Sequence, residues 1–389
     1  MSADWRQDYD EVALVLQGGG ALGSYQAGVV EGLAEAGIEP SWVAGVSIGA
    51  INAALFAGNA PAQRVTALRD FWRDICRQPG WLPGGWATHG LDEVPDPLSL
   101  WWSSMAAWRA LMEGQNGFYH PRLFPPILPG SGRATTASWY DTGELRRTLE
   151  RHLDFDRLND PRSPRVSVGA VQVRTGNLQY FDNRAQRLGP QHIMASGALP
   201  PGFPAVMVDG EPYWDGGLVS NTPLLQVLGD CGRARRLLVF QVDLWSAHGD
   251  APTGLLDVAE RLKDIQYSSR TRLVTDLMAR ELQHQRALQA LLDLLPPAQR
   301  GQAAARLAAD ASSPHQCNVI HLIYQAKADE GHAKDYEFSL PTMRAHWRSG
   351  LADLRASLAH PEWLAPPTPQ QPFVTHDIHR AARPARHAA

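Results

Sequence analysis

The chain has 389 residues, of which 44% are hydrophobic and 20% charged, a composition typical of globular proteins and unlike that of disordered ones. Its 36 basic and 40 acidic side chains nearly balance, with a formal net charge of −4, so charge provides no reason to expect nucleic acid as a partner. The three widely spaced cysteines predict neither a disulfide framework nor a zinc site; they are Cys76, Cys231 and Cys317. The polar N-terminus and the lack of a long apolar run lead us to expect a cytoplasmic protein, with peripheral membrane contact left open.

The N-terminal part of the chain predicts two successive strand–turn–helix units. Residues 11–16, EVALVL, are typical of a short buried strand, and residues 22–37 have helical spacing that ends at Gly37. The following residues repeat this pattern, with a strand to about Val46, a sharp turn, and a helix to about Ala57. Strands that alternate with helices at this spacing favour an α/β fold with a parallel sheet.

The sequence GGGALG, after the first strand, has the G-x-G-x-x-G spacing of dinucleotide-binding loops. Such a loop needs an acidic residue at the end of the second strand. Glu39 lies at a suitable distance after the glycines but precedes the second strand. At the end of that strand the chain has Ser47 instead of an acidic residue. A serine nucleophile needs backbone N–H donors for an oxyanion, and Gly18, Gly19 and Gly20 can turn such groups toward one point. We therefore favour an oxyanion hole over a dinucleotide site.

The turn after the second strand matches G-x-S-x-G, the pattern of a nucleophile elbow. Gly45 and Gly49 allow the sharp turn that would hold the hydroxyl of Ser47 out at the strand end. Ile48 begins the helix behind it. The alternative is a serine that caps the N-terminus of an ordinary helix.

Residues 60–140 form a less regular, tryptophan-rich insertion. We consider two interpretations, a lid or interfacial patch and the packed core of a cap region. The six tryptophans of this insertion are Trp72, Trp81, Trp86, Trp101, Trp102 and Trp108.

Regular elements return after the insertion and lead to a second candidate site. A capped helix is expected after Asp141, then strands near residues 165–173, 177–182 and 236–244. Between them, YWDGGLVSNTP places Asp215 before Gly216 and Gly217. Two glycines permit a turn that holds a carboxylate in a pocket at a fixed angle, although D-G pairs more often cap a surface turn.

The C-terminal part predicts helices over residues 255–310 and 343–359 and a strand over 316–324. We therefore expect a hydrolase core over residues 8–245 and a mainly helical extension over 246–365 that packs on it. A poorly ordered tail over 366–389 is expected from its composition.

Three motifs in order, GGGALGSYQAG, GVSIG and DGG, resemble those of the patatin-like phospholipases. The resemblance covers residues 11–243, and ASGALPPGFPAV resembles a further block of that family. It implies an α/β three-layer sandwich, a parallel-rich central sheet with helices on both faces, plus a helical C-terminal extension. It also implies hydrolysis of lipid acyl esters with Ser47 as nucleophile, Asp215 as base and an oxyanion hole at Gly18, Gly19 and Gly20. The implied chemistry uses no cofactor or metal.

Other functions stay open at this point. An esterase or polyester depolymerase with a Ser-His-Asp triad would need one of four later histidines, which are His248, His315, His321 and His332. An acyltransferase would need a histidine and a carboxylate-binding arginine, and no motif places either. A catalytically silent lipid-binding module would keep the same framework without turnover. The sequence does not decide the head group, the acyl chain or the oligomeric state.

Overall fold

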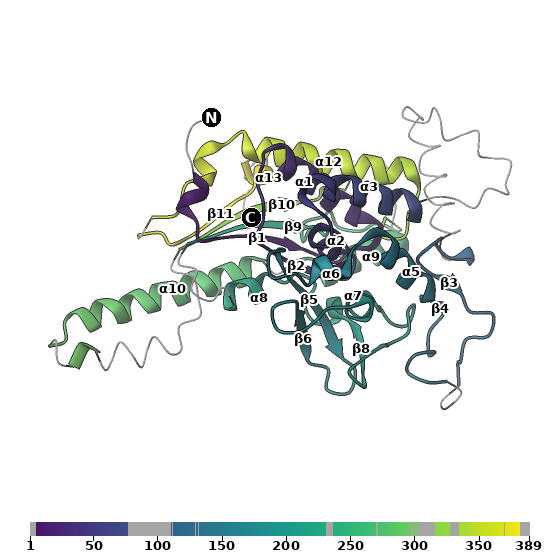
Figure 1. The fold of residues 1–389 in the computed structure, drawn as a ribbon. Helices are drawn as coiled ribbons and strands as arrows, with labels where there is room; N and C mark the ends of the chain where they lie inside the picture. The colour runs from purple at the N-terminus through teal and green to yellow at the C-terminus, as the bar shows by residue number, and fades with distance from the viewer. Residues whose placement is uncertain are drawn as a thin grey trace.

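The computed structural model describes residues 5–76, 110, 112–128, 130, 132–230, 236–269, 271–296, 299–301, 316–326, 334–368 and 370–381 (Figure 1). Within these ranges one large sheet has nine strands, in the order β11-β10-β9-β1-β2-β5-β8-β7, with β6 also paired to β5. Their bounds are β1 Glu11–Leu16, β2 Trp42–Val46, β5 Arg165–Gln172, β6 Leu178–Asp182, β7 Val206–Val208, β8 Glu211–Asp215, β9 Arg236–Asp243, β10 Gln316–Ile323 and β11 Phe373–His376.

The sheet is parallel over most of its width. Strands β11, β10, β9, β1, β2 and β5 pair in parallel, whereas β6, β7 and β8 form antiparallel pairs beyond β5. Parallel neighbours need a crossover connection, which the helices between the strands provide. The parallel-rich sheet expected from the sequence is confirmed.

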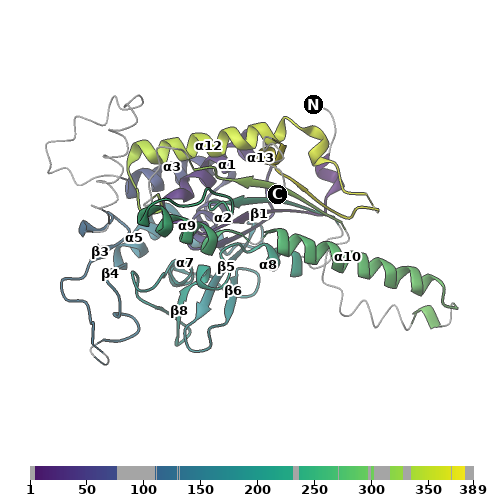
Figure 2. The same ribbon diagram turned by 180° about the vertical axis from the view of Figure 1, so that it is seen from behind.

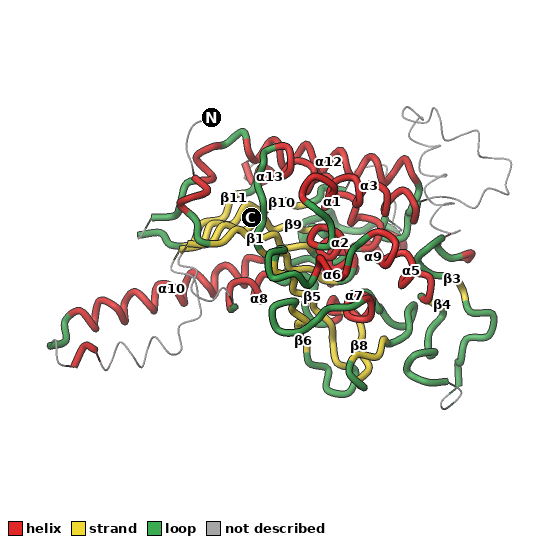
Figure 3. The backbone as a smooth tube through the Cα atoms, viewed as in Figure 1, coloured by secondary structure: helices red, strands yellow, loops and turns green. Residues whose placement is uncertain are grey.

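Helices cover both faces of this sheet, as Figures 1 and 3 show. Alternate residues of β1 enter different cores: Leu14 and Leu16 pack in the larger one, Ala13 and Val15 in the smaller one. The larger core receives side chains from α1 Gly23–Glu35, α2 Ile48–Ala57, α3 Arg64–Ile75, α5 Gly143–His152, α6 Phe155–Leu158, α7 Pro190–Ser196 and α12 Leu340–Leu358. The smaller core is covered by α8 Leu224–Gly229 and by α10 Thr271–Asp293. Because both faces are buried, the fold is a three-layer α/β sandwich.

The C-terminal segment completes this core as well as packing on it. Helix α12 lies along α1 (Figure 2), and a Cβ on Gly28 would lie 2.0 Å from the carbonyl oxygen of Trp347, so the two helices require glycine at their contact. Strand β10 pairs with β9 inside the sheet. The sequence predicted a poorly ordered tail over residues 366–389. Residues 373–376 of this tail instead form β11, which pairs with β10, and Phe373 is buried there.

Further short strands and helices complete the described fold. Strands β3 His120–Pro121 and β4 Tyr140–Asp141 pair with each other, and α9 Leu255–Tyr267 and α13 Ile378–Ala381 follow later. Short 3-10 helices occur at Trp5–Asp8, Gly20–Leu22, Pro61–Gln63, Gly216–Leu218 and Pro361–Leu364. Trp72 of the predicted insertion is buried in the larger core; the other tryptophans predicted to form a patch lie outside the described residues, at Trp81, Trp86, Trp101, Trp102 and Trp108. Within the described ranges, a helix combining bilayer-spanning length with sufficient hydrophobicity is not found.

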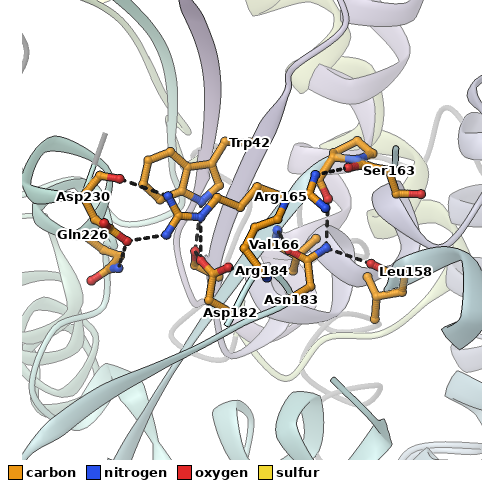
Figure 4. A network of polar contacts seen from close by, with 12 residues as sticks. Trp42, Leu158, Ser163, Arg165, Val166, Asp182, Asn183, Arg184, Gln226 and Asp230 are labelled. Atoms are coloured by element: carbon orange, nitrogen blue, oxygen red, sulfur yellow. Dashed lines mark hydrogen bonds and ion pairs between the residues drawn. The ribbon is translucent and has the colours of Figure 1, made fainter. Parts of the chain in front are cut away.

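A polar network joins the starts of β2 and β5 to the end of β6 (Figure 4). The Arg165 guanidinium lies 4.0 Å from the ring centroid of Trp42 and donates a 2.7 Å hydrogen bond to Asp182. It also binds the carboxylate and the backbone oxygen of Asp230, just after α8. Trp42 is the first residue of β2, and Ser47 follows its last residue. The network therefore holds one end of the strand whose other end carries the predicted nucleophile.

Candidate active site

Ser47 occupies a strained turn between β2 and α2. Its φ of 56° and ψ of −125° lie where residues other than glycine are rarely found. A Cβ on Gly45 would lie 2.3 Å from the carbonyl oxygen of Gly49, and one on Gly49 would lie 2.3 Å from that of Leu16. Both flanking glycines are therefore needed for this turn, and Ile48 begins the helix as expected.

Ser196, at the end of α7, holds the backbone of this turn. The Ser47 N–H donates a 3.0 Å hydrogen bond to Ser196 Oγ, and the Ser196 hydroxyl donates a 2.6 Å bond to the carbonyl oxygen of Gly169. Ser196 is fully buried, so losing its hydroxyl would leave the Ser47 N–H and the buried Gly169 carbonyl oxygen without this partner. We did not predict this residue, although it lies within the ASGALPP segment.

Asp215 ends β8 and meets Ser47 inside the protein. Asp215 is 2% exposed, and its carboxylate accepts a 2.7 Å hydrogen bond from the Gly217 N–H. The Ser47 side chain lies close enough to lower the pKa of this carboxyl. Burial raises the pKa of Asp215 to about 7, against the smaller lowering effects of the Ser47 side chain and the Gly217 N–H. A carboxylate with such a pKa can exchange protons near neutrality. Gly216 and Gly217 begin the 3-10 turn that follows it.

The glycine loop approaches Ser47 so closely that a Cβ on Gly18 would lie 2.9 Å from Ser47 Cβ. The carbonyl oxygen of Gly18 accepts hydrogen bonds from Asn221 Nδ2 at 3.0 Å and from Trp245 Nε1 at 2.8 Å. In a trans peptide the next N–H points the opposite way, so these two donors turn the Gly19 N–H away from themselves.

The N–H of Gly18 differs from the prediction for this loop. It donates a 3.2 Å hydrogen bond to the backbone oxygen of Asn221. This N–H is therefore already hydrogen-bonded within the protein. Within the described residues, no such bond is present for the N–H of Gly19 or Gly20. These two groups, at the start of a short 3-10 helix, are the available donors of the three glycines.

Gln17 fixes the loop to two neighbouring segments. Its side-chain oxygen accepts hydrogen bonds from the N–H groups of Leu244 at 2.6 Å and Trp245 at 3.0 Å, and its side-chain nitrogen donates to Thr222 Oγ1 at 2.9 Å. Sequence reasoning missed Gln17, Asn221 and Trp245. A polar residue at the end of an apolar strand was the only local signal, and Gln17 is fully buried.

These residues surround a cavity of about 90 Å³. It is mostly apolar, and three phenylalanines come from distant parts of the chain: Phe118 and Phe203 have ring centroids 6.0 Å apart, and Phe118 and Phe338 6.3 Å. The cavity is lined by Gly18, Gly19, Gly20, Ser47, Ile48, Ile51, Phe118, Tyr119, Gly197, Leu199, Phe203, Asp215, Gly217, Asn221, Trp245, Tyr267, Asp335, Tyr336 and Phe338. The C-terminal segment thus contributes directly to its wall.

The two candidate histidines that the structure describes, His248 and His321, do not line the cavity that contains Ser47. His321 binds the carboxylate of Asp243 at the end of β9, and His248 lines a separate, polar cavity. His315 and His332 lie outside the described residues. Within the described ranges, no group of three or more His, Cys, Asp or Glu side chains is arranged to hold a metal ion.

Two family models match this chain, and both are described as patatin phospholipases. The family model described as patatin-like phospholipase matches residues 14–228, and a model described as patatin phospholipase matches residues 265–370. Over 49 residues the chain is 55% identical to lysophospholipase nte1 of Aspergillus terreus; this covers 13% of the chain and only 3% of that relative's length. Among solved structures, VipD from Legionella pneumophila is similar with a TM-score of 0.39 and 16% identity, over 90% of this chain and 67% of VipD.

Proposed function

Because this chain belongs to the patatin-like phospholipase family, whose model covers more than half of its length, we propose that it hydrolyses acyl esters of lipids with Ser47 and Asp215. The observation that carries this proposal is that Ser47, on its strained turn, and the buried carboxylate of Asp215 line one cavity together with the glycine loop. Cleavage proceeds through an acyl-enzyme, so one difficult displacement becomes two easier ones.

In the first step Ser47 attacks the ester carbonyl. Asp215 takes the hydroxyl proton as the new C–O bond forms, and then gives it to the departing alcohol or lysolipid oxygen. The raised pKa of Asp215 supports this role, because a carboxylate of ordinary pKa is a weak base near neutrality. The strained turn presents the Ser47 hydroxyl beyond the strand end, with the N-terminus of α2 behind it.

The negative oxygen of the tetrahedral intermediate is stabilised by the backbone N–H groups of Gly19 and Gly20. Donors fixed before the reaction need no reorganisation when charge develops, and losing one typically costs about 100- to 1,000-fold in rate. The bonds from Asn221 and Trp245 to the Gly18 carbonyl oxygen support this assignment because they orient the Gly18–Gly19 peptide. Asn221 and Trp245 are therefore positioning residues for the oxyanion hole.

In the second step water hydrolyses the acyl-enzyme. Asp215 accepts a proton from the water that attacks the Ser47 ester, and returns it to the serine oxygen as the fatty acid is released. Both steps use the same carboxylate and the same N–H donors, so no further titrating group is needed. The base of this dyad is a carboxylate, in contrast to the histidine of a triad.

The substrate is an ester with a long apolar acyl part. The wall formed by Phe118, Phe203 and Phe338 supports this choice because it offers apolar surface directly next to Ser47. The match to a lysophospholipase favours a phospholipid ester over a stored polyester.

Two substitutions test the proposed dyad. Ser47→Ala should lower kcat for p-nitrophenyl esters by at least about 10⁴-fold, and Asp215→Asn should lower it by about 100- to 10,000-fold. A fluorophosphonate probe should label wild type and the control Ser246→Ala, a serine outside this cavity, but not Ser47→Ala. Wild-type turnover in Ser47→Ala, or a labelled Ser47 in a protein that hydrolyses no ester, would contradict the proposal. A panel of phospholipids and p-nitrophenyl esters of graded chain length then defines the substrate.

A further inference from the structure

Helix α9 is oriented with its charged side toward the protein. Lys263 Nζ contacts both carboxylate oxygens of Asp335, at 2.8 and 3.0 Å. From the protein side, Lys334 reaches Glu260 at 3.1 Å and Asp264 at 2.8 Å. Asp335 lines the cavity, and Lys334 directly precedes it in the chain. The Lys334 side chain is buried. These ion pairs hold α9 against the wall of the candidate active site.

The other charged residues of α9 also have partners within the protein. Asp257 caps the helix by accepting hydrogen bonds from the N–H groups of Thr253 at 3.2 Å and Gly254 at 3.0 Å. The Arg261 guanidinium donates to the backbone oxygen of Ala247. Each charged side chain of this helix is therefore engaged by the protein.

The opposite side of α9 is apolar and exposed to solvent. Four apolar residues repeat at intervals of three and four positions, which places them on one stripe of the helix. We name this stripe the α9 outer face; its residues and their exposed fractions are Leu255 (88%), Val258 (47%), Leu262 (62%) and Ile265 (57%). A surface helix of a globular protein normally has the reverse arrangement. Helix α9 lies on the side of the molecule turned to the reader in Figure 2.

The α9 outer face adjoins the cavity. Tyr267, the last residue of α9, lines the cavity, and its backbone oxygen accepts 3.0 Å hydrogen bonds from the side chains of Gln17 and Asn221. Leu218 and Val219, which are also exposed, follow the cavity-lining Gly217. Exposed Leu218 and Val219 therefore follow cavity-lining Gly217, and exposed Ile265 lies two positions before cavity-lining Tyr267.

We propose that the α9 outer face docks the protein on the surface of a phospholipid aggregate, with the cavity turned toward the lipid. This choice of occupant rests on the proposed function, because an acyl ester must pass from the aggregate to Ser47. A helix that lies in the interface with its apolar side buried among acyl chains meets the physical requirement. Because each charged side chain of α9 is already engaged within the protein, binding depends on apolar area, and salt or anionic lipid has little effect.

A lipid surface fits these residues better than a second helix does. Helices that pair through such a stripe use flanking charged residues to set partner and register. On α9 the exposed positions Ala259 and Gln266 carry no charge, exposed Asp257 is used as the helix cap, and Arg261 is bound to Ala247. A bilayer needs no directional partner.

Flotation with phosphatidylcholine vesicles tests the docking surface, using Ser47→Ala as the background so that lipid is not consumed. Replacing Leu255, Val258, Leu262 and Ile265 by Gln should lower the vesicle partition coefficient by about 100-fold, at low and at high salt. These side chains are exposed, and Gln is a good helix former, so the fold should be retained. In the background with Ser47 intact, the same variant should hydrolyse vesicular lipid at least 10-fold more slowly, and a water-soluble p-nitrophenyl ester within about 2-fold of wild type.

The matched control replaces Leu277, Leu288, Leu291 and Leu294 by Gln. They are exposed residues on or just after α10, which runs outward from the body of the molecule (Figure 1). This control, made in the same Ser47→Ala background, should float with the vesicles to the same extent as Ser47→Ala alone. Equal flotation of both variants, or loss only in the control, would overturn the docking proposal. The proposal would also be overturned if wild type forms a dimer in the absence of lipid and the variant with four glutamines on the α9 outer face is monomeric. If wild type floats but hydrolyses no ester, the proposed function fails and the docking surface stands.

Discussion

The buried carboxylate of Asp215 should make the protein less stable at neutral pH than in mild acid, and Asp215→Asn should remove this cost. Burial raises the pKa of Asp215 from 3.8 to about 7. Each unit of pKa difference between folded and unfolded states corresponds to about 1.4 kcal/mol. The ionised carboxylate therefore costs about 4 kcal/mol of folding free energy once the pH exceeds 7.

The direction of the pH dependence follows from the protons bound in each state. Below about pH 3.8 the carboxyl is protonated in both states, and its contribution to stability is fully present. As the pH rises toward 7, the unfolded chain has lost this proton and the folded protein keeps it, so the contribution is lost progressively. Asparagine has no such titration and can still accept the hydrogen bond from Gly217.

The measurement is urea unfolding of wild type and Asp215→Asn at several pH values. The stability difference in favour of the variant should grow by about 2–3 kcal/mol between about pH 5 and about pH 8. Other titrating groups are common to both proteins and cancel in this difference. Ser47→Ala keeps the carboxylate and removes a side chain that lowers its pKa, so its stability should fall between these pH values at least as much as that of wild type. A difference that stays constant with pH, or that shrinks toward pH 8, would refute the raised pKa.

Three further predictions concern catalysis and the polar network of the sheet. Because the ionised form of Asp215 is the proposed base and its pKa is raised to about 7, kcat/KM for a soluble ester should rise by roughly 100-fold from about pH 5 to about pH 8; a flat profile would exclude this base. Trp245→Phe keeps a ring but removes the donor to the Gly18 carbonyl oxygen, so kcat should fall by about 10-fold with little change in KM, and an unchanged kcat would contradict the positioning role. Arg165→Met leaves Asp182 without its guanidinium partner and should lower the free energy of unfolding by about 3 kcal/mol. Arg162→Met, at an exposed pair, is the control and should change it by less than about 0.5 kcal/mol; equal effects of the two arginine variants would count against the network.

Local chemistry allowed much of the core to be predicted from the sequence. The apolar strands at residues 11–16 and 42–46, each followed by glycines and a helix, predicted the α/β class, and the three-layer sandwich and the family are confirmed. The turn at Ser47 could be predicted because its requirement for glycine is a steric property of a few adjacent residues. The roles of Ser47 and Asp215 remain proposals that the experiments above test.

Contacts between distant residues were decided only by the tertiary structure. Asn221 and Trp245 reach the Gly18 carbonyl oxygen from more than 200 positions away, and no local spacing indicates such a bond. The same holds for Phe338, which brings the C-terminal segment into the cavity wall. In α9, periodicity reveals an apolar stripe but not which way it points; the ion pairs of Lys263 and Lys334 turn it outward. Steric and hydrophobic patterns act over a few residues and are therefore legible in the sequence, whereas hydrogen bonds and ion pairs depend on which surfaces folding brings together.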